Sequence, residues 1–90
     1  MRSITTFRQS YLSAVEYYRA IDQLLARRFN EAVERASNDA TRFPRIGKVF
    51  KNYRVLILNG FPYSFCYREN LDGELVAILL FHHKQREPGI

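Results

Sequence analysis

The spacing of apolar residues changes at Pro44, near the middle of this chain, and that change limits what the chain can fold into. Before Pro44, apolar residues recur every three or four positions from Tyr11 to Phe43. After it, short apolar runs are separated by turn residues. The first spacing is typical of amphipathic helices and the second of strands. The sequence therefore predicts a helical half followed by a sheet half.

Two helices are expected in the first half. The first begins at Arg8, and Asp22 is well placed to cap the start of the second. Pro44 disfavours helix at the residue before it, so the second helix should end at Phe43. One long bent helix is the alternative, but the doubled apolar stripe favours a hairpin. Residues 3–7, rich in β-branched side chains, are expected to form a short strand before the helices.

Three strands are expected in the second half, over residues 53–58, 61–68 and 74–81. Asn59 and Gly60 form a strong turn signal, because both residues tolerate positive φ. The last run is almost wholly apolar, which predicts a central strand buried on both faces. Residues 46–51 are expected to be a basic connection. The prediction is an α+β fold in which a short N-terminal strand precedes a helical hairpin packed on a small antiparallel β-sheet.

A chain of 90 residues is expected to form one domain over residues 1–90, with a flexible polar tail from about residue 84. Cys66 is the only cysteine, so no internal disulfide can form. The sequence has neither a signal-peptide core nor an apolar run of about 18 residues that would cross a bilayer. We therefore expect a cytoplasmic protein with no membrane partner.

Positive charge is concentrated in the middle of the chain, which has a net charge of +5. No acidic residue occurs from Ala40 to Arg68. The basic residues in this stretch are Arg42, Arg45, Lys48, Lys51, Arg54 and Arg68. A region of one sign attracts phosphate groups or an acidic protein segment. The alternative is a solvated basic surface with no dedicated ligand.

The motifs of common enzyme classes are missing from the sequence. His82 and His83 are adjacent, so on a strand they point to opposite faces and cannot share one metal ion. No Gly-rich phosphate loop and no motif of the Gly-x-Ser-x-Gly or His-Glu-x-x-His type occurs. We therefore expect no metal and no cofactor.

A basic and aromatic set remains as the candidate site, near one edge of the expected sheet. Its members are Arg54, Tyr63, Tyr67, Arg68, His83, Lys84 and Arg86. Such a set could hold an RNA phosphate and stabilise charge during strand scission, with His83 as the proton carrier. The alternative is that Tyr63 and Tyr67 are structural aromatics and that Arg54 and Arg86 make structural ion pairs.

Six short pieces of the chain occur in an order that resembles the RelE/ParE superfamily of small toxins from type II toxin–antitoxin systems. They are Tyr17-Tyr18, residues 25–29 (Leu-Ala-Arg-Arg-Phe), Phe43-Pro44, Arg54, Phe61-Pro62-Tyr63 with Tyr67, and His83 with Arg86 and Pro88. The resemblance covers most of the chain. It implies a helical hairpin on a small antiparallel sheet, which agrees with the fold predicted from the apolar spacing.

The resemblance also implies a function. It implies a toxin neutralised by a cognate antitoxin, usually a small protein with an acidic, partly disordered segment that wraps the toxin. The Leu-Ala-x-x-Phe helix and the Phe-Pro-Tyr hairpin are closer to ParE-type plasmid stabilisation proteins, which inhibit DNA gyrase. RelE-type members instead cleave messenger RNA on the ribosome, often with a C-terminal tyrosine, and no tyrosine follows Arg86 here.

Three functions therefore stay open at this point. A ParE-like gyrase inhibitor is favoured, and whether the chain is an enzyme is undecided. A RelE-like endoribonuclease would use Arg54, His83 and Arg86 as catalytic residues. The binding residues expected for the antitoxin or target are Arg42, Arg45, Lys48, Lys51, Arg54, Tyr63, Tyr67, Arg68 and Lys84. The third hypothesis is a non-toxic basic binding module. The expected assembly is either a homodimer or a toxin–antitoxin heterotetramer.

Overall fold

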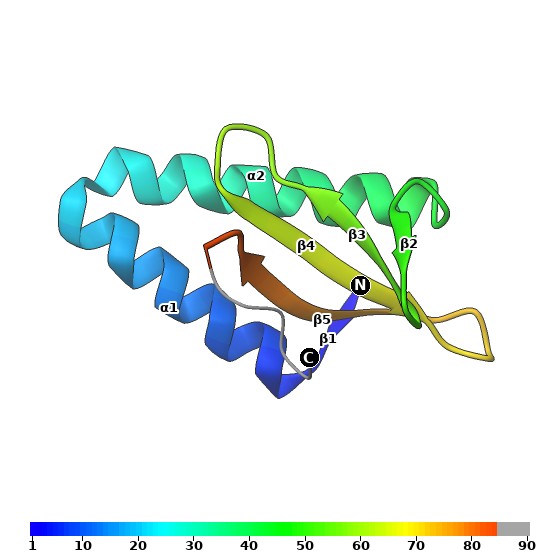
Figure 1. Ribbon diagram of the computed structural model, residues 1–90. Helices are drawn as coiled ribbons and strands as arrows, with labels where there is room; N and C mark the ends of the chain where they lie inside the picture. The colour runs from blue at the N-terminus through cyan, green and yellow to red at the C-terminus, as the bar shows by residue number, and fades with distance from the viewer. Residues whose placement is uncertain (85–90) are drawn as a thin grey trace.

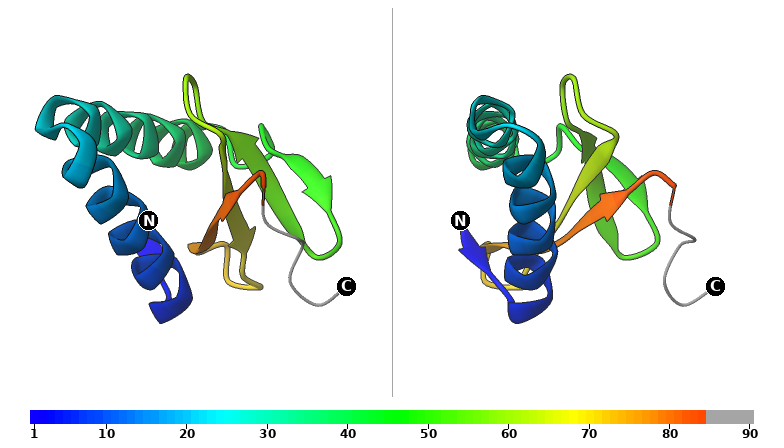
Figure 2. Two further views of the ribbon diagram at one scale, coloured as in Figure 1. Left: turned by 60° about the vertical axis from the view of Figure 1, so that its left-hand side comes forward. Right: turned by 90° about the vertical axis from the view of Figure 1, so that its left-hand side faces the viewer.

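The computed structural model describes residues 1–84, and it places two helices on one face of a five-stranded sheet (Figures 1 and 2). The helices are α1 (Thr5–Ile21) and α2 (Gln23–Arg42). The strands are β1 (Arg2–Ser3), β2 (Lys48–Phe50), β3 (Tyr53–Ile57), β4 (Tyr63–Glu69) and β5 (Leu75–His82). The predicted α+β class is confirmed. Residues 85–90, which include the predicted tail, lie outside the described residues.

The strand order across the sheet is β1-β5-β4-β3-β2. The pairs from β2 to β5 are antiparallel, and turn signals predicted two of them, β3–β4 and β4–β5. Gly60 adopts a positive φ of 83° between β3 and β4. β1 runs parallel to β5, with Arg2 opposite Val76. The sheet is therefore mixed rather than wholly antiparallel, because the N-terminal strand enters alongside the last one.

The helix hairpin forms largely as predicted. Asp22 is extended, with φ of −167°, and separates the two helices. Its carboxylate accepts a hydrogen bond from the backbone N–H of Leu24 at 2.9 Å, which caps α2. α2 ends at Arg42, one residue before the predicted end. The prediction of two helices rather than one bent helix is confirmed.

The prediction of a strand over residues 3–7 was wrong for residues 5–7. α1 begins at Thr5, not at Arg8, after an extended Ile4. Phe7 explains the difference, because its buried ring meets Phe65 of β4 with ring centroids 5.5 Å apart. From a helix, Phe7 joins the same buried stripe as Ala14 and thereby outweighs the weak β-propensity of the threonines.

The expectation of a simple connection over residues 46–51 was also wrong, because Lys48–Phe50 form the edge strand β2. Val49 pairs with Arg54, and Phe50 pairs with Tyr53. The tight turn between β2 and β3 requires Lys51 to adopt a positive φ of 55°, a conformation that few non-glycine residues take. No Asn-Gly or Asp-Gly pair marks this turn in the sequence, and the pattern therefore missed it.

The core between the helices and the sheet is largely aromatic. Phe29 of α2 is fully buried, and its ring centroid lies 5.1 Å from that of Tyr18 and 5.2 Å from that of Tyr63. β5 lies between β1 and β4, but only one of its faces is covered by the helices, so Leu79 and Phe81 are only half-buried. The prediction that this strand is buried on both faces was therefore wrong. No helix within residues 1–84 is long and apolar enough to span a membrane.

Candidate functional site

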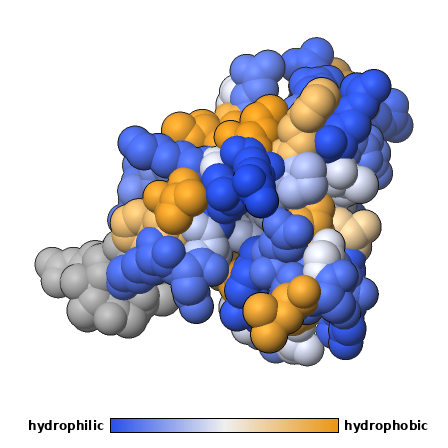
Figure 3. Space-filling view, turned by 90° about the vertical axis from the view of Figure 1, so that its right-hand side faces the viewer, coloured by the Kyte–Doolittle hydropathy of each residue, from blue (hydrophilic) through white to orange (hydrophobic). Residues whose placement is uncertain are grey.

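The basic residues of the acid-free stretch gather at one end of the molecule. Arg42 ends α2, Lys48 lies on β2, and Arg68 is near the end of β4. These elements meet at the right of Figure 1, and Figure 3 views that end directly. Hydrophilic residues cover most of it, with separate hydrophobic patches between them.

Three of the predicted binding residues line one hollow of about 310 Å³ at the β2–β3 hairpin. They are Lys51, Arg54 and Arg68, and the carboxylate of Glu69 lines the same hollow. Cations at this density can hold a carboxylate or a phosphate by charge-assisted hydrogen bonds. The hollow is therefore suited to an anionic group from a partner.

Arg54 and Tyr67 also have structural partners. The Tyr67 hydroxyl donates to the Pro44 carbonyl at 2.8 Å and accepts from the Gly47 N–H at 3.0 Å. The Arg54 guanidinium donates to the carbonyls of Gly47 at 2.9 Å and Arg45 at 3.3 Å. A Cβ on Gly47 would lie 2.8 Å from the Tyr67 hydroxyl oxygen, so only glycine fits there without a shift. We call these four contacts the Tyr67 bracket.

Arg54 and His83 are not brought together. The Nε2 atom of exposed His83 lies 3.0 Å from the Ser64 hydroxyl, on the sheet face away from the helices. Arg54 pairs with Tyr67, whose side chain points into the core on the opposite face. Along β4, Tyr67 and Tyr63 are four residues apart, roughly 13 Å at about 3.3 Å per residue. His83 follows His82, which is the strand partner of Tyr63. Arg54 and His83 therefore lie on different faces of the sheet and at different positions along it.

The remaining predicted residues are dispersed. Tyr63 is buried, and burial first and the neighbouring Tyr17 second raise the pKa of its hydroxyl, which keeps it neutral near pH 7. Arg45 is exposed, as is Lys84, whose backbone N–H donates to His82. Arg86 lies outside the described residues. Within residues 1–84, no cluster of His, Cys, Asp or Glu is arranged to hold a metal ion.

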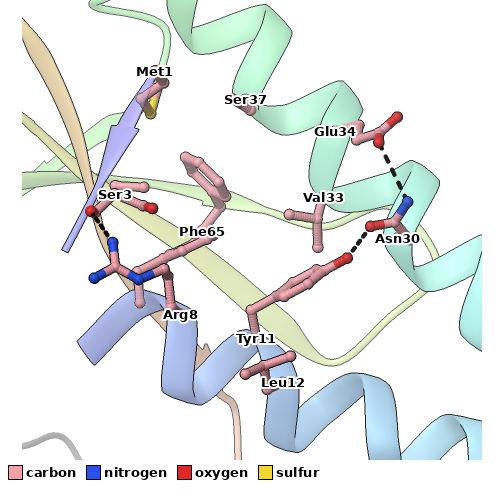
Figure 4. Close-up of a pocket in the computed structure, with 12 residues that line it drawn as sticks. Met1, Ser3, Arg8, Tyr11, Leu12, Asn30, Val33, Glu34, Ser37 and Phe65 are labelled. Atoms are coloured by element: carbon pink, nitrogen blue, oxygen red, sulfur yellow. Dashed lines mark hydrogen bonds between the residues drawn. The ribbon is translucent and has the colours of Figure 1, made fainter. Parts of the chain in front are cut away.

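A groove with a volume of about 470 Å³ lies between α1 and α2 (Figure 4). The helices diverge from their hairpin end (Figure 1), and the groove lies between them over the buried sheet residues Phe65 and Ala77. Phe7, Val33, Phe65 and Ala77 supply apolar lining. Leu12, 56% exposed, adds an apolar side chain at the groove edge.

Polar contacts lie around the groove and, at Tyr11, cross it (Figure 4). Arg8 donates to the Ser3 carbonyl at 2.6 Å on the α1 side. The Tyr11 hydroxyl donates to the Asn30 side chain across the groove, and Asn30 in turn donates to Glu34 at 3.3 Å. Burial and then the Glu34 carboxylate raise the pKa of Tyr11, so its hydroxyl stays a neutral donor. The groove thus combines apolar lining with fixed polar edges, as peptide-binding grooves do.

This groove was not predicted from the sequence. The signal available was weak: Leu12 is an apolar residue off the main buried stripe of its helix. A single exposed leucine is common on protein surfaces. The groove forms because the two helices diverge. Their divergence depends on how they pack, and no short sequence motif predicts it.

The fold is similar to that of a solved structure described as "Chromosomal ParDE TA system from P. aeruginosa". The match to a chain of that structure has a TM-score of 0.75 and 12% sequence identity, and it covers 90% of this chain and 91% of that chain. No protein-family model matches the chain, and no curated protein matches it. A likeness at this identity establishes a shared fold, and the predicted arrangement of a helical hairpin on a small sheet agrees with it.

The Tyr67 bracket yields a prediction about stability. Tyr67→Phe removes one hydroxyl and leaves the buried Gly47 N–H without its partner, which should lower the free energy of unfolding by about 1–3 kcal/mol. Tyr17→Phe makes the same chemical change on a ring that is 62% exposed, and it should cost less than about 0.5 kcal/mol. Urea denaturation of both variants measures the difference. Equal losses in the two variants would show that the bracket has no special role.

Proposed function

We propose that this chain is the toxin of a type II toxin–antitoxin pair and that it acts as a ParE-like inhibitor of DNA gyrase. The observation that carries the proposal is the groove between α1 and α2 on a fold shared with a chain of a ParDE TA structure. The groove offers an apolar site for a partner segment on a domain with a small core. The proposal agrees with the order of short sequence pieces that resembles this superfamily.

The antitoxin is the first partner that we propose. A second hollow of about 410 Å³ shares Met1 with the groove and is lined by Thr41 and Pro44. Arg2 and Glu74, which form an ion pair at 3.2 Å, also line this hollow. Its residues Thr41 and Pro44 adjoin Arg42 and Arg45 in the chain, at the start of the acid-free stretch. An antitoxin segment could place apolar side chains in the groove, pass Met1, and set carboxylates against the basic end. Such a segment would order as it binds and would cover apolar surface of the toxin.

Gyrase is the target that we propose, in preference to ribosome-bound messenger RNA. A ribonuclease built on Arg54, His83 and Arg86 would need these groups around one phosphate. Arg54 donates to two carbonyls on the helix-covered face, and His83 bonds Ser64 on the other face. This separation supports a toxin that acts by protein contact. The same reasoning favours a non-enzymatic role. We also propose that the chain acts in the cytoplasm, as a homodimer or as part of a toxin–antitoxin heterotetramer.

RNA cleavage is the second candidate, and one observation favours it. Lys51, Arg54 and Arg68 line one hollow that suits a phosphate. A RelE-like activity could use this hollow without His83. A gyrase inhibitor should reduce DNA supercoiling by gyrase, whereas a RelE-like ribonuclease should cleave messenger RNA on the ribosome.

The first prediction of the proposed function is inhibition of gyrase. Purified protein at micromolar concentration should reduce supercoiling of relaxed plasmid by gyrase, and expression of the chain alone should arrest growth. Co-expression of an acidic protein encoded by the neighbouring reading frame should restore growth. A parallel assay with translating ribosomes and labelled messenger RNA serves as the comparison. Transcript cleavage with normal supercoiling would replace the proposal by its RNase alternative, and no effect in either assay would favour a non-toxic binding module.

The second prediction concerns the groove. Leu12→Glu places a charge at the groove edge and should weaken antitoxin binding at least about tenfold, or about 1.4 kcal/mol. Ile21→Glu is the matched control, because Ile21 is also an exposed apolar residue of α1 but does not line the groove. Calorimetric titration of each variant with the antitoxin measures the effect. A loss of affinity that is equal in the two variants would place the antitoxin elsewhere.

A further inference from the structure

The turn between β3 and β4 carries the only Asn-Gly pair of the chain, Asn59-Gly60. The pair shapes the turn, and it also has a reactivity of its own. An asparagine side chain and the backbone nitrogen of the next residue can close to a cyclic imide when that nitrogen is unshielded. Glycine shields it least, because it has no Cβ and its backbone turns freely. The other four asparagines of the chain precede larger residues.

The Asn59-Gly60 pair is open to solvent and has room to move. Both residues are exposed, and the loop that carries them projects from the end of the sheet (Figure 2). A Cβ on Gly60 would meet no atom within 4 Å, so the backbone there has space to turn. Within residues 1–84, no hydrogen bond holds the Asn59 side-chain amide or the Gly60 N–H. The backbone nitrogen of Gly60 and the amide carbon of Asn59 are therefore both accessible.

The asparagine of the next turn is held more tightly. Asn70 follows β4 and is half-buried. Its backbone N–H donates to the Glu74 carbonyl at 2.8 Å, and its backbone carbonyl accepts from the Gly73 N–H at 2.9 Å. Leu71, which comes next, places a side chain beside the backbone nitrogen that would have to attack. Asn70 is therefore an internal control, because it has the same amide in a turn with a fixed backbone and a larger neighbour.

We propose that Asn59 is a site of spontaneous deamidation in which the backbone nitrogen of Gly60 is the nucleophile. This nitrogen loses its proton and forms a bond to Cγ of Asn59, the bond from Cγ to Nδ2 breaks, and ammonia leaves with the proton. One water molecule then opens the cyclic imide. Opening at Cγ gives aspartate, and opening at the backbone carbonyl gives isoaspartate, whose main chain runs through Cβ and Cγ. The reaction needs only water, and it does not depend on the proposed function.

The turn is anchored in the core on both sides of this pair. Leu58 is buried, and its N–H donates to the Tyr63 carbonyl at 2.9 Å. The ring centroid of Phe61 lies 5.2 Å from those of Tyr18 and Phe29. Isoaspartate adds one carbon atom to the main chain between these two anchors. The chain must then shift at Leu58 or at Phe61, and the close packing of a protein core makes such a shift unfavourable.

Aspartate at the same position changes the charge but not the length of the main chain. Asn59 lines a hollow of about 80 Å³ together with Arg35 and Asp39 of α2, so a new carboxylate there has one cation and one anion as neighbours. The effects of two opposite charges largely offset each other, and each is small at an exposed site. We therefore expect the isoaspartate product to destabilise the fold and the aspartate product to leave its stability almost unchanged.

Peptide mapping of the aged chain tests the site. The full chain is kept at neutral pH and physiological temperature for several days, and samples are digested with trypsin and weighed by mass spectrometry. Cleavage after Arg54 and Arg68 releases residues 55–68, in which Asn59 is the only asparagine, whereas residues 69–84 carry Asn70. The first peptide should gain about 1 Da at least about tenfold faster than the second. Part of its product should be isoaspartate, which chromatography separates from aspartate.

Two substitutions separate the cyclic route and its consequence from other causes. Asn59→Gln keeps the amide and the turn glycine but would have to close a larger ring, so residues 55–68 should stay unmodified. Asn59→Asp, measured when freshly purified, supplies the aspartate product directly. The converted wild type should melt at least about 4 °C below the fresh protein, whereas Asn59→Asp should shift the melting temperature by less than about 2 °C.

Several results would overturn the proposal. Modification of the chain in urea but not of the folded chain would show that the turn protects Asn59. A product without isoaspartate would mean that water attacks the amide directly and that Gly60 is not the nucleophile. Equal gains of mass in the wild type and Asn59→Gln would place the reaction at another residue. A converted wild type that melts like Asn59→Asp would show that the longer main chain does not disturb the Leu58 and Phe61 anchors.

Discussion

The hydroxyl of Tyr67 joins the two halves of this molecule. Tyr67 lies on β4, and its ring is fully buried in the core. Its hydroxyl donates a hydrogen bond to the Pro44 carbonyl and accepts one from the Gly47 N–H. The chain between α2 and β2 is therefore fixed against the sheet at the point where helix gives way to strand. Arg54 secures the same segment by donating to Gly47 and Arg45. β2 and the basic end that it carries take their positions from this bracket.

The two faces of the sheet differ in what lies on them. On the helix side, aromatic rings around Phe29 fill the core, and the diverging helices leave the groove between them. On the other side, a hollow of about 210 Å³ is lined mainly by apolar residues, among them Val55 and Leu79. A domain of 90 residues buries a modest share of its surface, so apolar area remains for partners.

The sequence predicted the elements whose signals are local. Asp22 predicted a helix cap, Pro44 predicted a helix end, and Asn59 with Gly60 predicted a turn. Each feature lies within one residue of its predicted position. β2 was missed because its turn relies on positive φ at Lys51, a residue that rarely adopts it. The parallel pairing of β1 with β5 was missed because contacts between residues so far apart leave no local pattern.

The candidate site was predicted less completely, for reasons of strand parity and helix packing. Composition identified the cations that meet in one hollow, Lys51, Arg54 and Arg68. It did not reveal that Arg54 and His83 belong to opposite faces, because a shift of one residue in register reverses the face of every side chain. The groove depends on the angle between two helices, which no motif in the chain specifies.

The most direct test of the central claim, that the groove receives the antitoxin, is hydrogen exchange of the chain with and without the acidic protein encoded by the neighbouring reading frame. Binding of the antitoxin in the groove should slow exchange at residues 8–12 and 30–37, which flank the groove, and at residues 42–48 of the basic end. Complex formation with unchanged exchange in these segments, and protection confined to β3–β5, would contradict it.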